Sequence, residues 1–336
     1  MRGRLLAAGG VLGAGLVLGS GVPAAAEPAG PATLCQISDA RLAELSGLVA
    51  VTDGILAMSD GGEQLAVYRL DGACQVVDAR TAPVDPYDPE DMAVAPDGTV
   101  WLADIGDNNA TRTTVALLAF RPDGTTGTFR LTYPDGPHDA EALLLAPDGT
   151  PYVVTKEVLG ASGVYSPATA LVDGGTVALA KVAGVNMTLT GTPGGPVGRA
   201  GQLMVTGGAV SADGRHLALR TYTDAYVWPL TGSDVVGALG GDPVAIPLPA
   251  SPQGEAISFA ADGASLLVAS EGLPSDLTQV PLDPGLVAAA APVPEGPVPS
   301  VTDLTRSGLS PWTSALLAAS VATAVVWITG KLRRRP

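Results

Sequence analysis

The chain has 336 residues and carries 33 acidic residues against 18 basic ones, for a formal net charge of −15. This length allows one large domain or two ordinary ones. The negative charge argues against nucleic acid as a partner, because its phosphates would be repelled.

The first 26 residues predict a secretory signal peptide. Arg2 and Arg4 precede a small-residue, apolar run from Leu5 to about Leu18, and three consecutive alanines ending at Ala26 offer a cleavage site. A basic start, an apolar middle and a small-residue end are typical of such signals. An uncleaved N-terminal membrane anchor is the alternative, but the glycine-rich run and the alanine triplet favour cleavage.

The cysteine content predicts one disulfide bond. Cys35 and Cys74 are the two cysteines of the chain, and an exported protein experiences oxidising conditions. A redox-active pair is less favoured, because the spacing is wide and the chain contains no C-x-x-C motif. We expect the bond to tie the N-terminal segment to the first repeat of the domain.

Residues 27–282 contain a repeated turn signal that predicts the fold. Asp-Gly pairs are turn formers, and five of them lie between short apolar runs: Asp53-Gly54, Asp97-Gly98, Asp148-Gly149, Asp213-Gly214 and Asp262-Gly263. Their spacings are 44 (97 − 53), 51 (148 − 97), 65 (213 − 148) and 49 (262 − 213) residues. Each unit shows up to four short strands, and four strands per unit of this length are typical of a propeller blade.

The predicted fold class is therefore all-β, a β-propeller of five four-stranded blades. The longest spacing leaves room for a degenerate sixth blade or for an insertion. A β-sandwich would also give many short strands, but it does not explain the repeated turn signal. Helices are expected only in the signal peptide and in a C-terminal transmembrane helix.

The C-terminal region predicts a membrane anchor. Residues 283–310 are rich in proline and alanine and indicate an extended stalk. Residues 311–330 lack charge from Trp312 to Ile328, which approaches the length of a membrane-spanning helix. Residues 331–336 form a basic tail, and positive charge beside a span stays on the cytoplasmic side. A buried core helix is the alternative, which the terminal position and the basic stop disfavour.

We therefore expect an exported domain on the extracellular face of the cell membrane, with the C-terminus in the cytoplasm. Six basic residues lie outside the exported part and all 33 acidic residues lie inside it, so its net charge is 12 − 33 = −21. Such a surface favours cation binding.

Acidic residues recur at one register in the predicted blades. In a blade, the first strand starts and the second strand ends at the same face, because the two are antiparallel. Counting seven residues back from each turn aspartate gives Ser46, Glu90, Glu141, Thr206 and Glu255. Three glutamates are thus expected to form an arc at one mouth of the central channel, with Glu141 near Lys156, Thr206 near Arg220, and Glu255 near Glu271.

Candidate site residues follow from this register. The predicted binding residues at the mouth are Glu90, Asp91, Asp104, Glu141, Lys156, Arg220 and Glu255. The predicted metal ligands are Asp88, Glu90, Asp104, Asp107 and Glu141. Ca²⁺ is the candidate cofactor, because hard cations bind several carboxylate oxygens.

Three interpretations of this mouth remain open at the level of sequence. The carboxylates could be structural, could bind Ca²⁺ and a small-molecule or protein ligand, or could act with Lys156 and Arg220 in a Ca²⁺-dependent phosphoesterase. No nucleophile motif, phosphate loop or dinucleotide fingerprint is present in the sequence. His138 is the candidate imidazole base near the mouth, and His216 is expected to be solvated.

The repeated segments resemble a known group of proteins. The stretches "DPEDMAVAPDGTVWLADIGDN", "DAEALLLAPDGTPYVVTKE", "SADGRHLALRTYTDAYVWP" and "PQGEAISFAADG" are similar to bacterial exported β-propeller proteins of the phytase-like group. The resemblance implies a propeller with a site at the channel mouth, where β-propeller phytases bind several Ca²⁺ ions and a phosphorylated inositol. The predicted binding residues are the positions that would carry such roles here.

Overall fold

The structure is a computed structural model that describes residues 30–62 and 64–289. The predicted signal peptide, the predicted anchor and tail, and the predicted stalk beyond residue 289 lie outside the described residues. In the described part the longest α-helix has six residues, so none of the described helices could cross a membrane.

Within the described residues, twenty strands form five groups of four. The first blade contains β2 (Leu45–Val51), β3 (Gly54–Ser59), β4 (Leu65–Leu70) and β5 (Val76–Ala82). The second contains β6 (Pro89–Val94), β7 (Val100–Asp104), β8 (Val115–Phe120) and β9 (Thr126–Thr132). The third contains β10 (Ala140–Leu145), β11 (Pro151–Thr155), β12 (Ala161–Pro167) and β13 (Thr176–Asn186). The fourth contains β14 (Val205–Val210), β15 (His216–Thr221), β16 (Asp224–Pro229) and β17 (Val244–Pro247). The fifth contains β18 (Gly254–Phe259), β19 (Ser265–Ser270), β20 (Ser275–Pro281) and β1 (Ala32–Ile37).

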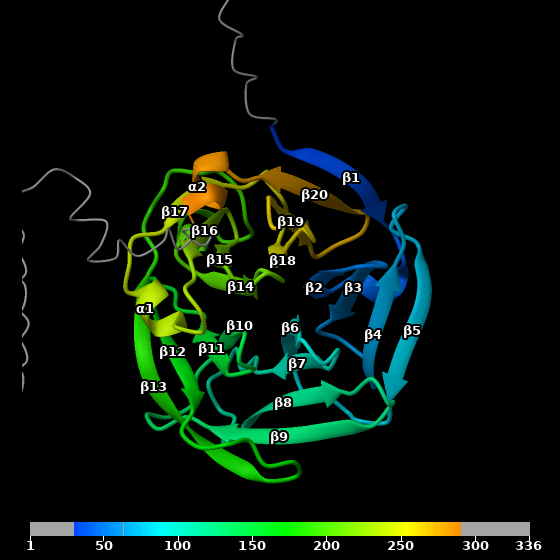
Figure 1. The fold of residues 1–336 in the computed structure, drawn as a ribbon, viewed down its shortest axis with the longest axis vertical. Helices are drawn as coiled ribbons and strands as arrows, with labels where there is room; N and C mark the ends of the chain where they lie inside the picture. Colours follow the sequence, from blue (N-terminus) through cyan, green and yellow to red (C-terminus); the bar gives the residue numbers. More distant parts are fainter. Residues whose placement is uncertain (1–29, 63, 290–336) are drawn as a thin grey trace, which may run out of the picture. The chain divides into compact units, whose positions relative to one another are not determined.

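The five groups are arranged around one axis as a β-propeller. Strands β2, β6, β10, β14 and β18 lie innermost, and later strands of each blade lie progressively further out (Figure 1). The second and third blades form one eight-stranded sheet, because their outermost strands β9 and β13 pair in parallel over three residues. This pairing protects two sheet edges that would otherwise expose backbone donors and acceptors.

The Asp-Gly pairs form the turns between the first and second strands of all five blades. The Asp97 carboxylate accepts a hydrogen bond from Thr99 N at 2.9 Å, and Asp148 accepts one from Thr150 N at 3.0 Å. Gly98 and Gly149 follow with φ of 83° and 84°, a conformation that favours glycine. The spacing signal therefore has a local physical cause.

Apolar side chains are buried between the blades. Five hydrophobic clusters each join two neighbouring blades; one of them packs Met58 of β3 against Met92 of β6 and Leu102 of β7. These side chains form the hydrophobic core between adjacent sheets. The first residues of the innermost strands are not needed for that core, so they can be polar.

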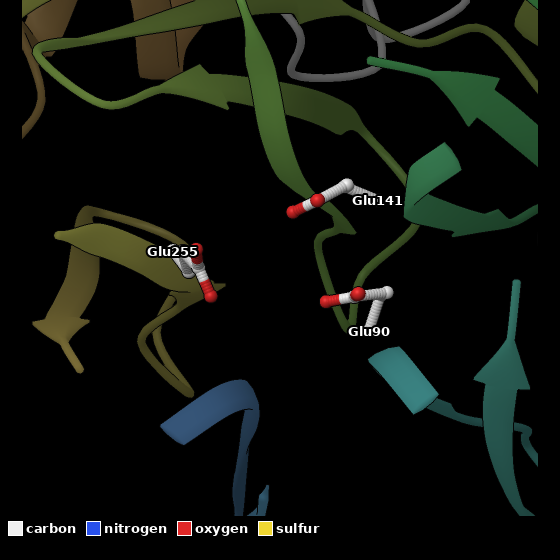
Figure 2. A group of neighbouring side chains, drawn as sticks. All are labelled: Glu90, Glu141 and Glu255. Carbon is white, nitrogen blue, oxygen red and sulfur yellow. The ribbon is translucent and has the colours of Figure 1, made fainter. Parts of the chain in front are cut away.

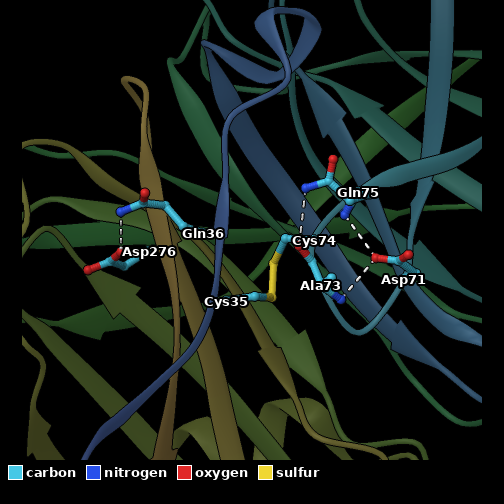
Figure 3. Close-up of a disulfide and its surroundings, with 7 residues drawn as sticks. All are labelled: Cys35, Gln36, Asp71, Ala73, Cys74, Gln75 and Asp276. Atoms are coloured by element: carbon cyan, nitrogen blue, oxygen red, sulfur yellow. Dashed lines mark hydrogen bonds between the residues drawn. A yellow bond between two sulfur atoms is a disulfide. The ribbon is translucent and has the colours of Figure 1, made fainter.

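The ring is closed by the N-terminal strand and by a disulfide bond. Strand β1 pairs antiparallel with β20 and completes the fifth blade. Cys35 of β1 is bonded to Cys74 in the β4–β5 turn of the first blade, with the two Cα atoms 5.7 Å apart (Figure 3). The predicted disulfide is confirmed, and it joins the first blade to the last.

The structure decides one alternative that the sequence left open and corrects one expectation. The long spacing holds an insertion, residues 187–204, with one 3₁₀-helix, η2 (Gly198–Gln202), and no sixth blade appears in residues 30–62 and 64–289. Short helices also occur outside the predicted signal and anchor: η1 (Ala40–Leu42), α1 (Val235–Leu239) and α2 (Pro284–Ala289). Asp39 caps η1 by accepting from Arg41 N, and Asp234 caps α1 by accepting from Gly237 N, which explains two of these short helices.

Candidate functional site

Each innermost strand carries a β-bulge at the same register. The pairing with the second strand skips one or two residues immediately after the first residue of the strand. The skipped positions include Ser46, Glu90, Glu141, Thr206 and Glu255. A bulge bends its strand and re-aims the extra side chain. The sequence register that selected these five residues therefore corresponds to a repeated irregularity of the backbone.

The bulges bring three glutamates together. Glu90 of β6, Glu141 of β10 and Glu255 of β18 each offer a carboxylate oxygen, and these oxygens lie within 4.8 Å of one another. Their side chains point toward a common centre (Figure 2). The three residues are 4%, 2% and 3% exposed, so the charges are shielded from bulk water. We call Glu90, Glu141 and Glu255 the glutamate triad.

The three members of the triad have different partners. Glu141 forms an ion pair with Lys156 Nζ. Glu255 accepts hydrogen bonds from Ser46 Oγ at 3.2 Å and from Gln253 Nε2 at 3.1 Å. Glu90 is also buried, and among the described residues its hydrogen-bonding partner is another carboxyl group, that of Asp88. Carboxyl groups in contact cannot all ionise at low cost, so they favour a shared proton or a bound cation.

Burial and mutual repulsion raise the pKa values of the acidic groups at this mouth. Burial, and then the charges of Glu141 and Asp88, raise the pKa of Glu90 well above its usual value. Burial raises the pKa of Glu141 to about 8, even though Lys156 opposes the shift. Burial and the neighbouring Glu255 raise the pKa of Glu271 to about 9. Burial, Glu44 and Glu255 raise the pKa of Asp60 to about 7. The carboxyl groups at this mouth therefore bind protons more tightly than isolated carboxylates do, and a bound cation would relieve the same repulsion between them.

The two predicted cations occupy different environments. Burial lowers the pKa of Lys156, but the charge that Glu141 carries once it is ionised outweighs this and holds the pKa above its usual value, so the ammonium stays charged. Its Nζ lies 5.4 Å from the centre of the Tyr222 ring, a neighbour that sequence reasoning did not identify. Arg220 pairs with Gly207, next to its predicted neighbour Thr206, but its guanidinium donates to the backbone carbonyls of Ala256 and Ala269, at 2.7 and 3.0 Å.

Asp104 and Asp107 belong to a separate hydrogen-bonded network. Asp104 accepts from the backbone N–H groups of Tyr87 and Asp88 and from Arg112 Nη2 at 2.8 Å. Asp107 accepts from Arg112 N at 2.7 Å. These carboxylates fix the loop after β7 and are not part of the triad. Arg112 was missed in the sequence, because a single arginine in a polar loop gives no signal of a buried partner.

Asp88 lies beside the triad. A Cβ atom placed on Gly106 would be 2.4 Å from Glu90 Oε1 and 2.5 Å from Asp88 Oδ2, so both oxygens face the same space. Burial and the Asp139 charge raise the pKa of Asp88. Of the five predicted metal ligands, the structure thus groups Glu90 and Glu141 with Glu255 and places Asp88 next to them.

Asp91 is a structural residue of the channel wall. It is 1% exposed, and its carboxylate accepts from the backbone N–H groups of Met92, Leu143 and Gly208 at 2.8, 2.7 and 3.1 Å. These donors belong to three different innermost strands. Burial raises the pKa of Asp91, although the three hydrogen bonds oppose the shift. We therefore assign Asp91 to holding the blades at the right spacing beneath the triad.

The histidines lie away from the triad. His138 Nε2 is 3.0 Å from Asp135 Oδ1 and 3.1 Å from the Tyr165 hydroxyl. His216 is 1% exposed, so the expectation that it is solvated was wrong. It packs beside Phe259, with ring centres 6.0 Å apart, and its Nε2 lies 3.3 Å from the Leu286 carbonyl of α2. Helix α2 was not expected, which is why this burial was missed.

Comparison with known proteins finds distant structural neighbours with propeller folds. No family model and no curated protein matches the sequence. A gluconolactonase from Xanthomonas campestris is 17% identical, with a TM-score of 0.42, and the match covers 71% of this chain and 72% of that one. The PQQ-bound aldose sugar dehydrogenase from Streptomyces coelicolor is 11% identical, with a TM-score of 0.40 and coverages of 76% and 99%. Virginiamycin B lyase from Staphylococcus aureus is 11% identical, with a TM-score of 0.37 and coverages of 74% and 73%. The phytase-like resemblance is not confirmed by these comparisons.

Proposed function

We propose that the propeller binds a hard divalent cation, Ca²⁺, at the glutamate triad and presents it to an oxygen-bearing ligand at the mouth. The observation that carries this proposal is Glu90, a buried carboxyl group that faces Glu141 and Glu255 and whose hydrogen-bonding partner among the described residues is a fourth carboxyl group, Asp88. Carboxylates of this kind are the ligands that Ca²⁺ and Mg²⁺ prefer in proteins. The proposed site is composed of Glu90, Glu141 and Glu255.

The choice of Ca²⁺ over Mg²⁺ rests on coordination flexibility. Mg²⁺ demands near-ideal octahedral geometry, whereas Ca²⁺ accepts about 6–8 oxygens in flexible arrangements. Three carboxylates whose oxygens lie within 4.8 Å of one another can contribute to such an irregular shell. Three glutamates supply three to six of the roughly 6–8 oxygens that Ca²⁺ takes, so water or a ligand would complete its coordination.

A second candidate function is Ca²⁺-dependent phosphoester hydrolysis. The charged Lys156 ammonium beside Glu141 favours it. Lys156 and a bound Ca²⁺ could together hold an anionic ester while a metal-bound water attacks. Arg220 is turned toward the backbone of the fifth blade, which leaves few cations for a highly charged phosphate. Ligand binding is therefore preferred over hydrolysis, and release of phosphate from a generic phosphoester would reverse this preference.

Thermal unfolding with Ca²⁺ and with chelator tests the proposal. A ligand at 100 times its Kd stabilises the folded state by about 2.7 kcal/mol. We expect Ca²⁺ to raise the Tm of the wild type and to have little effect on Glu90→Gln. Glu157→Gln is the matched control, because its side chain is 41% exposed and lies outside the triad. An equal Ca²⁺-induced rise in the Tm of the wild type and of Glu90→Gln would show that Ca²⁺ does not bind at the triad.

We also propose that the chain is exported and held at the extracellular face of the cell membrane by residues 311–330. The signal-like N-terminus, the uncharged C-terminal stretch and the basic tail support this topology. Removal of residues 311–336 should release the protein into the medium. Retention of the truncated protein in the membrane fraction would contradict the anchor.

A further inference from the structure

A pocket without triad residues in its lining lies in the fifth blade. Its volume is about 480 Å³, and it is lined by the fifth blade, by Arg220 and by the segment 249–252 between β17 and β18. Ser251, Glu271 and Asp276 contribute to its wall, and the three triad glutamates do not. Glu271 also forms a side-chain hydrogen bond with Glu255, so the pocket borders the triad without including it.

Arg220 brings an unused donor to this pocket. The side chain is 1% exposed, and the guanidinium has no carboxylate within 4.0 Å in the described part of the chain. Its Nη1 donates to two backbone carbonyls and its Nε to Thr221 O at 3.3 Å, but Nη2 has no acceptor among residues 30–62 and 64–289. Buried arginines are normally paired, so an anion at Nη2 would be favourable.

Ser251 brings a second unused donor to the same place. Its Oγ is buried and lacks a hydrogen-bond partner among the described residues. A Cβ atom placed on Gly254 would lie 2.1 Å from Arg220 Nη2 and 2.7 Å from Ser251 Oγ. Glycine at this position therefore makes room for the guanidinium itself, and the two donors lie on either side of one point beside residue 254. One oxyanion atom could accept from both at the usual distance of about 2.9 Å.

The remaining charges of the wall define the ligand. Asp276 is the carboxylate of the wall, because Glu271, with a pKa of about 9, is protonated at neutral pH. Asp276 disfavours a doubly charged anion such as phosphate. A ligand with one carboxylate and one ammonium group matches the guanidinium of Arg220 and the carboxylate of Asp276. Pro249, Pro252, Val268 and Leu273 supply an apolar surface for small side chains. We propose that this pocket binds a small zwitterion, an amino acid or dipeptide, with its carboxylate on Arg220 Nη2 and Ser251 Oγ.

Calorimetric titration of the full chain with dialanine tests this site. Dialanine amide lacks the carboxylate, N-acetyl-dialanine lacks the ammonium group, and inorganic phosphate tests a simple anion. We expect dialanine to bind, and each of the other three to bind at least tenfold more weakly. Ser251→Ala should weaken dialanine binding about tenfold or more, because hydrogen bonds to charged groups are strong.

The variants avoid the buried arginine, whose loss would remove a donor from three backbone carbonyls and could prevent folding. Ser251→Val fills the space with a methyl group and should abolish binding. Ser162→Ala is the matched control, because its hydroxyl is also buried without a partner among the described residues but lies in the third blade. No dialanine binding at millimolar concentration, equal binding of the amide or acetyl form, preferred phosphate binding, or unchanged affinity in Ser251→Ala would overturn the proposal. The Ca²⁺ response of these variants should match the wild type, which separates this site from the triad.

Discussion

The ionisation of Glu141 should destabilise the cation-free protein as the pH rises. Its pKa of about 8 in the folded protein lies above the ordinary value of 4.5, mainly because the group is buried. A raised acid pKa means that the folded state holds more protons than the unfolded state between these two values. Stability is therefore fully present below about pH 4.5 and is lost as the pH rises toward 8.

The size of the loss follows from linkage. Each pH unit in this window costs about 1.4 kcal/mol for one group, so two units between pH 5 and pH 7 cost roughly 3 kcal/mol. A domain stability of about 5–15 kcal/mol makes such a loss easy to measure. Urea unfolding in the presence of chelator at pH 5, 6, 7 and 8 gives the slope directly.

The double variant Glu141→Gln with Lys156→Met isolates the contribution of Glu141. Both partners are removed because a lone buried ammonium would itself destabilise the protein. We expect the slope of unfolding free energy against pH to become less negative by about 1.4 kcal/mol per pH unit. Identical slopes for the wild type and the double variant would refute the reasoning.

Three further predictions concern stability and the cation. Replacing Cys35 and Cys74 with serine should lower the free energy of unfolding, measured in urea, by about 3–4 kcal/mol, because 39 residues separate the bonded cysteines. A loss under about 1 kcal/mol would argue against ring closure by the disulfide bond. Asp91→Asn should cost about 3 kcal/mol, since an amide nitrogen would face a backbone N–H group, and an unchanged midpoint would contradict this. Ca²⁺ binding to the wild type should release protons, detected as buffer-dependent heat in calorimetry, whereas buffer-independent heat would mean that the triad is already ionised.

The blade pattern was predictable because its signal is local. In four of the five Asp-Gly turns the carboxylate accepts from the residue two positions later, and in all five the glycine has a positive φ, so five markers located five hairpins. The register of Glu90, Glu141 and Glu255 followed from antiparallel pairing alone. Strand β1 was not assigned to the last blade, because the pairing of distant strands leaves no local trace.

Side-chain partners were less predictable than strand positions. Thr206 and Arg220 start on opposite strands of one hairpin, but the long arginine side chain reaches the carbonyls of the fifth blade instead. Asp91 follows Glu90 directly in the sequence, but successive side chains of a strand point to opposite faces. The Asp91 carboxylate therefore meets three backbone N–H groups from separate blades, and it does not join the triad. Such roles depend on neighbours that are distant in the chain.

The location of bound Ca²⁺ tests the central claim most directly. Crystals grown with calcium chloride should show one anomalous difference peak within about 2.3–2.6 Å of an oxygen from each of Glu90, Glu141 and Glu255. A peak at Asp104 and Asp107 instead, or triad carboxyls hydrogen-bonded to one another with calcium present, would show that these acids share protons and hold no metal.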